Sequence, residues 1–397
     1  MGETGAPVWV VIPAGQQASG GWIDDTLKAR AEERGMMAAA PLTGDFPRQR
    51  VEAVAGGDPE TRVRDLFERR GWTDGLPVVA PTTARVRRMI AGGHLSANEV
   101  LGAVEPLKGL ATVEKVAANA VMAGCKPAYF PVVLAAVEAL LDPEFNLNGV
   151  QTTDENVAPL LIVSGPVAER IGLNASFGAL GPGWAANATI GRALRLVMLN
   201  LGGGRAGLVS FAGLGQAGRY TLCLAENAAQ SPWAPIHTEA GLPAEASAVT
   251  LTRAETVVNV TGGLEEIATV MGTAVSAFQI MWSGRPTVIL APATAAELAA
   301  RGMSKDDVRA WLHAHGRWPA DSWERSWFKS GLVAEGRWKD WVLEGAAQGA
   351  IPATKAPEDI VIVVAGGDVP IPQHAYCPSW GSPPARITRE VRVPRGG

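Results

Sequence analysis

A single cysteine lies at the break between two apolar helical segments. Residues 118–140 read ANAVMAGCKPAYFPVVLAAVEAL, in which Cys125 follows the helix-ending Gly124 and precedes Lys126 and Pro127. Because proline is favoured in the first turn of a helix, we expect Cys125 just before a helix N-terminus. The positive end of the helix dipole and the ammonium of Lys126 would both lower the pKa of the thiol and favour the nucleophilic thiolate. The alternative is a small buried residue in a tight turn, a common environment for free cysteine.

A second segment has the features of an anion site. Residues 178–204 read GALGPGWAANATIGRALRLVMLNLGGG, so that a Gly-Pro-Gly turn leads into a helix starting near Asn187 and Thr189. Free backbone N–H groups at such a start bind phosphate or carboxylate, and Arg192, about one turn further, would add a guanidinium. The pattern is neither a Walker loop nor a dinucleotide fingerprint. A glycine-rich turn that allows close helix packing is the alternative.

A third segment, residues 218–237, is a β-like run that ends on Glu226 and Asn227 and continues through Trp233 to His237. Loops at strand ends often line pockets, and Glu226 would serve as a general base if it is partly desolvated. The alternative role for Glu226 is to cap a neighbouring helix. His237 has no His or carboxylate partner at metal-ligand spacing, so no metal site is predicted.

These segments are predicted to meet in one place. Cys125, Arg192 and Glu226 each lie at a helix start or a strand end, and such positions gather along the carboxyl edge of an α/β sheet. We therefore expect the three side chains to line one pocket, with the thiol and the guanidinium on the order of 5 to 10 Å apart. Asp74, in the turn Trp-Thr-Asp-Gly before an apolar run, is explained most simply as a turn residue.

Composition restricts the class of protein. The chain has 397 residues, 47% hydrophobic and 19% charged, which indicates a compact globular protein with a sizeable core. A net charge of −4 provides no basic field for nucleic acid, and no apolar run is long enough to cross a membrane. The three cysteines are few, odd in number and widely spaced, so they indicate neither a disulfide framework nor a zinc knuckle. We expect a cytoplasmic protein with reduced thiols.

Alternating β-type and helical segments predict an α/β fold with mixed sheets and flanking helices. Residues 1–60 are expected to form a small αβ extension, with a strand at 8–14, a helix at 23–35 and a linker at 41–60. Strands are predicted at 159–166, 248–252, 256–263, 359–367 and 386–393. Helices are predicted at 112–123, 128–141, 187–201, 264–277, 304–315 and 335–348.

The main body, residues 61–397, is expected to be either one large domain or two similar lobes, at about 61–245 and 246–397. Residues 75–93 and 284–312 share one plan, in which a proline, a β-branched run and the sequence Ala-Pro-x-Thr-Ala precede a helix. This similarity suggests an internal duplication, although a match this short also arises by chance.

Several motifs together resemble an uncharacterised bacterial family, namely WTDGLPV, MAGCKP, NATIGRA and AENxxxSPW, between about Trp72 and His315. Some members accompany small proteins that carry a selenocysteine-Gly-Ser-Cys motif, which implies thiol or selenol chemistry nearby. This chain lacks that motif. The resemblance implies no particular reaction, but it implies a set of site positions: Asp74, Cys125, Asn187, Arg192, Tyr220, Glu226, Asn227 and Trp233.

The sequence therefore predicts a cysteine-dependent enzyme for a small anionic or carbonyl-containing metabolite, acting by lyase, hydrolase or redox chemistry. Cys125, Lys126 and Glu226 are the expected catalytic residues. The expected substrate-binding residues are Asp74, Asn187, Thr189, Arg192, Tyr220, Asn227 and Trp233. The alternatives are a non-catalytic ligand-binding subunit of a redox or biosynthetic complex, and a nucleotide-binding enzyme. No cofactor is identified, and a redox partner protein or a homo-oligomer is compatible with the sequence.

Overall fold

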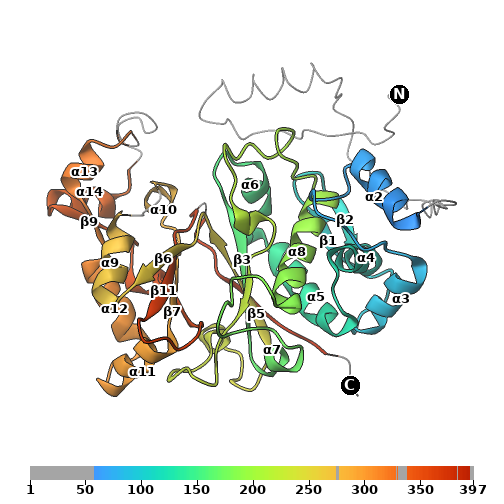
Figure 1. The fold of residues 1–397 in the computed structure, drawn as a ribbon. Helices are drawn as coiled ribbons and strands as arrows, with labels where there is room; N and C mark the ends of the chain where they lie inside the picture. Colours follow the sequence, from blue (N-terminus) through green and yellow to red (C-terminus); the bar gives the residue numbers. More distant parts are fainter. Residues whose placement is uncertain (1–57, 274–276, 328, 330–337, 382, 394–397) are drawn as a thin grey trace.

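The structure of the protein is a computed structural model that describes residues 58–273, 277–327, 329, 338–381 and 383–393 (Figure 1). The strand and the helix predicted at 8–14 and 23–35 lie outside these residues. The described chain begins at Asp58, whose side chain accepts a hydrogen bond from the Glu60 N–H and caps helix α2.

Two four-stranded mixed sheets form the centre of the molecule. Sheet 1 has the order β12-β5-β3-β4, and sheet 2 has the order β10-β7-β11-β6. The strands of sheet 1 are β3 (Ala158–Ser164), β4 (Cys223–Ala225), β5 (Ala248–Ala254) and β12 (Ile387–Glu390). The strands of sheet 2 are β6 (Val258–Thr261), β7 (Thr287–Leu290), β10 (Val361–Val364) and β11 (Gln373–Cys377). Two hairpins pair β1 (Val100–Val104) with β2 (Gly109–Thr112) and β8 (Arg317–Pro319) with β9 (Ala350–Pro352).

The helices surround these sheets. In the first half of the chain they are α2 (Pro59–Arg70), α3 (Thr83–Ala91), α4 (Val113–Ala123), α5 (Phe130–Leu140), α6 (Leu147–Thr152), α7 (Pro166–Arg170) and α8 (Ala185–Asn200). In the second half they are α9 (Leu264–Thr273), α10 (Ala277–Met281), α11 (Pro292–Ala300), α12 (Lys305–His315), α13 (Ala320–Glu324) and α14 (Asp340–Ala347). The 3-10 helices are η1 (Pro127–Tyr129), η2 (Pro143–Phe145), η3 (Ala217–Arg219), η4 (Ile236–Ala240) and η6 (Pro357–Asp359).

Strand periodicity divides the core into layers. Along β3, Leu161 and Val163 point outward to a core shared with α4, α5 and α8, whereas Leu160 and Ile162 point inward to a core shared with sheet 2. The outer face of sheet 2 packs on α9, α11 and α12. The protein is therefore a four-layer α/β/β/α sandwich, with the helices of the two halves on opposite sides in Figure 1. The predicted α/β class is confirmed.

The two sheets share one pattern of pairing. In each sheet a parallel edge pair, β4-β3 or β10-β7, is followed by two strands that pair antiparallel. Each parallel pair is joined by a crossover through helices, α7 and α8 in sheet 1 and α11 and α12 in sheet 2. Pro166 and Pro292 occupy the first turn of the first helix in each crossover. This correspondence supports a duplication with a different alignment from the predicted one.

The predicted counterpart of the β7–α11 unit, the segment 75–93, is not a strand followed by a helix. Its β-branched run is extended but unpaired in any sheet, and its Val79 N–H donates to the Met122 carbonyl. Helix α3 does follow it. The counterpart that the fold provides is β3 with α7.

The predicted division of the chain at 245/246 does not coincide with the sheets, because β5 and β12 both belong to sheet 1. Strand β6, which follows β5, pairs in sheet 2 with β11, and β12, which follows β11, pairs in sheet 1 with β5. The chain thus crosses from β5 in sheet 1 to the edge strand β6 of sheet 2, and later returns from β11 in sheet 2 to the edge strand β12 of sheet 1.

Candidate functional site

Cys125 lies where the sequence predicts, between two helices. Helix α4 is capped by the Thr112 hydroxyl and ends at Gly124, whose φ of 92° is the left-handed conformation that glycine favours. The Cys125 Sγ is 3.2 Å from the Thr189 carbonyl oxygen, and the residue is 9% exposed. Burial raises the pKa of the Cys125 thiol to about 12. The prediction of a low thiol pKa is therefore wrong.

The two effects expected to lower this pKa are weakened by the local geometry. Lys126 is exposed to solvent. The segment after it is a three-residue 3-10 helix, and α5 begins only at Phe130. Because the dipole effect of a helix falls off within its first turn, the thiol gains little from α5.

Arg192 is already paired within the protein. Its guanidinium forms two hydrogen bonds of 2.8 Å with the Asp74 carboxylate and also donates to the carbonyls of Leu76 and Pro77. Burial opposes ionisation of Asp74, but the hydrogen bonds and charge of Arg192 hold the pKa of this carboxyl below its usual value. Asp74 and Arg192 thus link α8 to the turn before α3, and only Nη1 of the Arg192 guanidinium has no hydrogen-bond partner within the described residues.

The side chains at the start of α8 turn toward the backbone. The Asn187 side chain accepts from the Asn174 N–H and donates to the carbonyls of Asn174 and Ala179, and it is 4% exposed. The Thr189 hydroxyl donates to the Ala185 carbonyl at 2.6 Å. The Asn187 side chain holds the loop that enters the helix, and the Thr189 hydroxyl bonds within the first turn of α8, so both polar groups have partners inside the protein.

Glu226 follows β4 and is enclosed between the sheets. Both of its oxygens accept from the Ile236 N–H, at 2.9 and 3.1 Å. Burial raises the pKa of Glu226 to about 7, although this hydrogen bond and the charge of Lys305 lower it. A carboxyl group with this pKa would suit a proton carrier, but Glu226 lies in the interior at 4% exposure.

The remaining predicted binding residues are dispersed. The Asn227 side chain exchanges hydrogen bonds with Gln230, and the Trp233 indole N–H donates to the Met303 carbonyl at 3.2 Å. Tyr220 is half exposed on the segment before β4.

Sheet 1 separates the predicted catalytic residues. Cys223 and Ala225 of β4 face the outer core that contains Cys125, whereas Leu224 faces the core between the sheets. The Glu226 N–H continues the β3–β4 ladder, so its side chain shares the inner face with Leu224. The expected common pocket of Cys125, Arg192 and Glu226 is therefore not formed.

A buried Ser–His pair stands beside Glu226 and was not predicted. The Ser164 Oγ, at the end of β3, lies 2.7 Å from the His237 Nδ1, and the His237 Nε2 lies 3.0 Å from the Pro243 carbonyl oxygen. Only a protonated Nε2 can donate to that carbonyl, so in the neutral ring Nδ1 accepts from the serine hydroxyl. Both residues are completely buried, which suits a structural bond that holds the 226–243 segment to the sheet.

Arg195, one turn beyond Arg192, is a buried cation for which the described residues provide no acidic partner. Its Nε donates to the Arg219 carbonyl at 2.5 Å, and within the described residues its two Nη groups have no hydrogen-bond or ion-pair partner. Arg195 is 9% exposed. Burial, together with the charge of Arg219, lowers the pKa of Arg195 to about 9, which reflects the cost of a buried charge that no carboxylate contacts.

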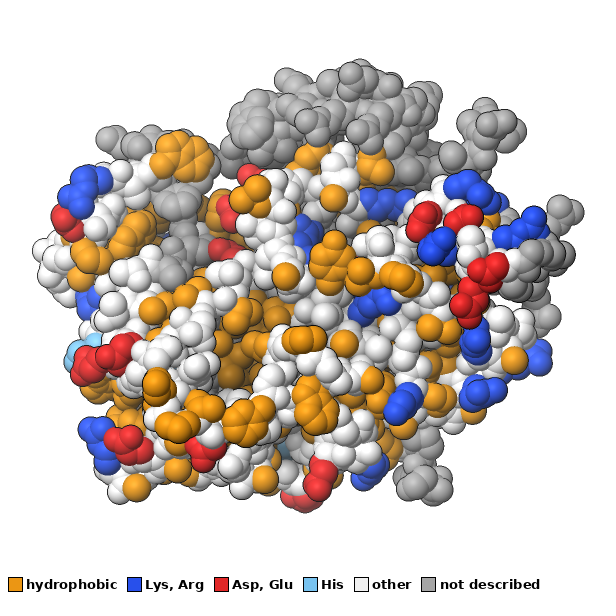
Figure 2. Space-filling view, in the orientation of Figure 1, with side chains coloured by type: hydrophobic (Ala, Val, Ile, Leu, Met, Phe, Trp, Pro, Cys, Tyr) orange, Lys and Arg blue, Asp and Glu red, His pale blue; other side chains and the backbone are white. Residues whose placement is uncertain are grey.

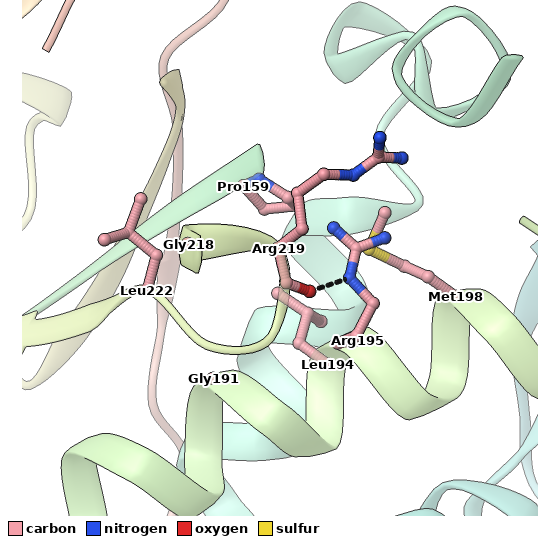
Figure 3. Close-up of a pocket in the computed structure, with 8 residues that line it drawn as sticks. All are labelled: Pro159, Gly191, Leu194, Arg195, Met198, Gly218, Arg219 and Leu222. Carbon is pink, nitrogen blue, oxygen red and sulfur yellow. Dashed lines mark hydrogen bonds between the residues drawn. The ribbon is translucent and has the colours of Figure 1, made fainter. Parts of the chain in front are cut away.

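A small cavity of about 10 Å³ adjoins this guanidinium (Figure 3). In Figure 3 the Arg195 side chain extends from α8 toward the segment of Arg219, and both guanidinium groups lie on the same side of that segment. Arg219 donates to the Ser210 hydroxyl at 2.7 Å and, among the described residues, forms no ion pair. The cavity is lined by Pro159, Gly191, Leu194, Arg195, Met198, Gly218, Arg219 and Leu222.

Arg195 carries only a weak signal in the sequence. The residue lies inside the run ALRLVML, where a single arginine on an apolar helix is usually a surface residue whose stem covers neighbouring side chains. Only the fold shows that α8 packs against the segment before β4 at this point. The predicted arginine and the unpaired one differ by three positions, which is one helical turn.

Comparison with protein-family models and with curated proteins finds no match for this chain. Among the described residues, no group of three or more His, Cys, Asp or Glu side chains is arranged to hold a metal ion. None of the described helices is long and apolar enough to cross a membrane. On the face in Figure 2, acidic and basic side chains are interspersed. The fold and the site thus define an α/β/β/α protein with a buried, unpaired arginine.

Proposed function

We propose that this protein binds a small anionic metabolite through Arg195, with Arg219 beside it. The observation that carries the proposal is the buried guanidinium whose two Nη groups have no acidic partner within the described residues. The proposal keeps the small anionic ligand predicted from the sequence and transfers its recognition from Arg192 to Arg195. A cytoplasmic location and a small-molecule partner remain part of it.

The position of Arg195 in the interior has an energetic consequence. A buried charge is tolerated when it is paired, and an isolated one costs several kcal/mol or shifts its pKa. Arg195 has one backbone acceptor at Nε, so the two Nη groups remain available to an anion. A bidentate bond between a guanidinium and an oxyanion is among the stronger charge-assisted contacts in proteins. An anion at these groups would therefore supply the opposite charge that Arg195 lacks.

Arg219 adds a second positive charge at the same place. Burial lowers the pKa of Arg219 as it does that of Arg195, and the two guanidinium groups repel each other. One anion between them would relieve both the repulsion and the loss of solvation. The charge of Asp74 offsets part of this repulsion at Arg195, but Asp74 is paired with Arg192, so neither guanidinium contacts a carboxylate.

Cysteine-dependent chemistry is not part of this proposal. Cys125 is buried with a raised pKa, and Glu226 lies on the opposite face of sheet 1 from α8. Neither is assigned a contact with the ligand. The proposal therefore corresponds to the ligand-binding alternative, with an anion as the ligand.

The substitution Arg195→Met tests the proposal, because it removes the charge while keeping an unbranched apolar stem. Acetate, sulfate and phosphate are added to the wild-type protein at constant ionic strength, and thermal unfolding is followed. An anion at 100 times its dissociation constant should raise the free energy of unfolding by about 2.7 kcal/mol. R195M should lose this increment, and without anion it should be at least as stable as the wild type.

The matched control is Arg301→Gln, which removes one positive charge from an exposed side chain after α11. R301Q should retain the full response to anions. An increment that persists in R195M, or the lack of any response in the wild type, would refute the proposal. Circular dichroism of R195M distinguishes a lost site from a lost fold.

A further inference from the structure

We infer that the anion bound by Arg195 is a carboxylate, because sheet 2 carries the same arginine arrangement with a carboxylate already in place. This inference rests on the proposed function and specifies the ligand of the same site. Arg309 on α12, beside sheet 2, is the residue to compare with Arg195 on α8, beside sheet 1.

Arg309 corresponds to Arg195 in position. Each lies on the second helix of the crossover between two parallel strands, α12 or α8, on the outer face of its sheet. The Arg309 Nε donates at 2.9 Å to the carbonyl of Ile360, directly before β10, and the Arg195 Nε donates to the carbonyl of Arg219, shortly before β4. Both arginines are buried, at 6% and 9% exposure. The two halves thus hold an arginine by the same backbone contact.

The two arginines differ in what their Nη groups meet. Arg309 Nη2 lies 2.6 Å from the Glu239 carboxylate, and Nη1 lies 2.6 Å from the carboxylate of Asp306. Asp306 is one helical turn before Arg309, whereas the residue one turn before Arg195 is Arg192, which is itself basic. The acidic partner supplied within α12 is therefore absent from α8.

Glu239 comes from η4, between β4 and β5, so a segment of the first half supplies the carboxylate that completes the arginine site of the second half. Burial opposes ionisation of Glu239, but Arg309, Lys305 and Arg386 lower its pKa to about 2. Within the described residues no acidic side chain performs this task for Arg195. We therefore expect a carboxylate of the ligand to contact Arg195 as the Glu239 carboxylate contacts Arg309.

The walls of the cavity restrict the rest of the ligand. Leu194, Met198 and Leu222 line it beside the guanidinium, and its volume of about 10 Å³ admits one oxygen-sized group. Carboxylate and phosphate can both accept two parallel N–H groups from a guanidinium, but a phosphate has further oxygens that need donors of their own, whereas a carboxylate is satisfied by the pair. The cavity therefore admits one oxygen of such a carboxylate, and the rest of the ligand would lie outside it, against the apolar side chains.

The test compares acetate and propionate with inorganic phosphate on the full chain, at matched ionic strength and with chloride as the reference salt. Wild-type protein should bind the two carboxylates at least about tenfold more tightly than phosphate, a difference of about 1.4 kcal/mol. R195M should bind none of them. Arg195→Lys keeps the charge but loses the planar fork, so it should reduce the preference for carboxylates.

The Glu239→Ala variant calibrates the same measurement. It removes the internal carboxylate from Arg309, so acetate should restore part of its lost stability and phosphate should restore less. If phosphate or sulfate binds the wild type more tightly than acetate and R195M abolishes that binding, the carboxylate inference is overturned while the proposed anion site stands. If no anion binds the wild type although acetate rescues E239A, both the inference and the proposed function fail.

Discussion

At the carboxyl end of β4, Glu226 is enclosed between the two sheets and accepts from one backbone N–H group. Its pKa is raised from the ordinary value to about 7 because burial disfavours the charged form. The charged groups that act on it are Lys305, which favours the ionised form, and Glu239, which opposes it. Such a group makes folding depend on pH in the neutral range.

We predict that the free energy of unfolding decreases as the pH rises. Between the unfolded pKa of 4.5 and the folded pKa of about 7, the folded state holds a proton that the unfolded state has lost, so the free energy of unfolding falls as pH rises through this window. The loss should approach about 3 kcal/mol above pH 7, since one pKa unit corresponds to about 1.4 kcal/mol. Glu226→Gln should abolish it and be the more stable protein at pH 8.

Urea denaturation between pH 5 and pH 8 measures this effect. The control is Glu245→Gln, an exposed residue in the segment before β5, which should keep the wild-type slope. An E226Q protein with an unchanged slope would show that Glu226 is ionised in the folded state throughout this range.

Individual residues show how far sequence reasoning extends. The turn at Cys125 was predicted correctly from Gly124 and Pro127, since capping and proline rules are local. The burial of its thiol depends on the Thr189 carbonyl, 64 positions away, and no local rule contains that contact. The same limit applies to Arg195, whose partner carbonyl belongs to Arg219 across the sheet crossover.

At the scale of elements, the Arg192–Asp74 pair fixes α8 against the turn before α3. Asp74 and Arg192 side chains are 5% and 14% exposed, so the pair is largely removed from solvent. Breaking such a pair from one side leaves an unpaired buried charge, which commonly costs about 3 to 5 kcal/mol. The two carbonyl contacts of Arg192 compensate for part of this cost.

We therefore predict that Asp74→Asn lowers the free energy of unfolding by about 2 to 4 kcal/mol. The double variant Asp74→Asn with Arg192→Leu should be more stable than D74N alone, because it no longer buries an unpaired guanidinium. Chemical denaturation of the two single variants and the double variant gives the coupling energy. Additive effects would mean that the pair contributes nothing as a pair.

The elements themselves were predicted where local signals are strong. Helices α4, α8 and α12 and strands β3 and β5 fall where periodicity and caps indicate them. The run Val78–Val79 has the composition of a strand, yet it lies outside both sheets, because propensity does not decide whether a pairing partner is present. Strand β11 was missed, since its residues 373–377 include Gln, His and Cys.

For the whole molecule, the arrangement of strands could not be obtained from the sequence. The exchange of β6 and β12 between the sheets depends on pairs of residues more than 110 positions apart in the sequence, such as Val260 with His374 and Thr250 with Thr388. Only three residues, 255–257, join β5 in sheet 1 to β6 in sheet 2. The sequence match of 75–93 with 284–312 pointed to the wrong counterpart, and both the repeated pairing pattern and the exchange become apparent only in the fold.

One charged cluster reinforces this exchange. Glu239 of η4 contacts Arg309 and Lys305 of α12 and also Arg386, directly before β12. The three cations come from the second half of the chain and the carboxylate comes from the first. The side chains are largely buried, with Arg309 8% and Lys305 10% exposed, so the contacts are little screened by salt.

We predict that the two sheets unfold as one unit. Opening sheet 2 alone would remove β6 from β11 and expose the inner core of both sheets, while opening sheet 1 alone would release β12 from β5. Native-state hydrogen exchange should therefore give the central amides of β5 and β11, such as those of Leu251 and Ala375, opening free energies that agree within about 1 kcal/mol. The β1–β2 hairpin, outside both sheets, serves as the internal control and should open at lower free energy. Clearly lower values throughout β7, β10 and β11 with full protection in β3 and β5 would instead establish two independently stable lobes.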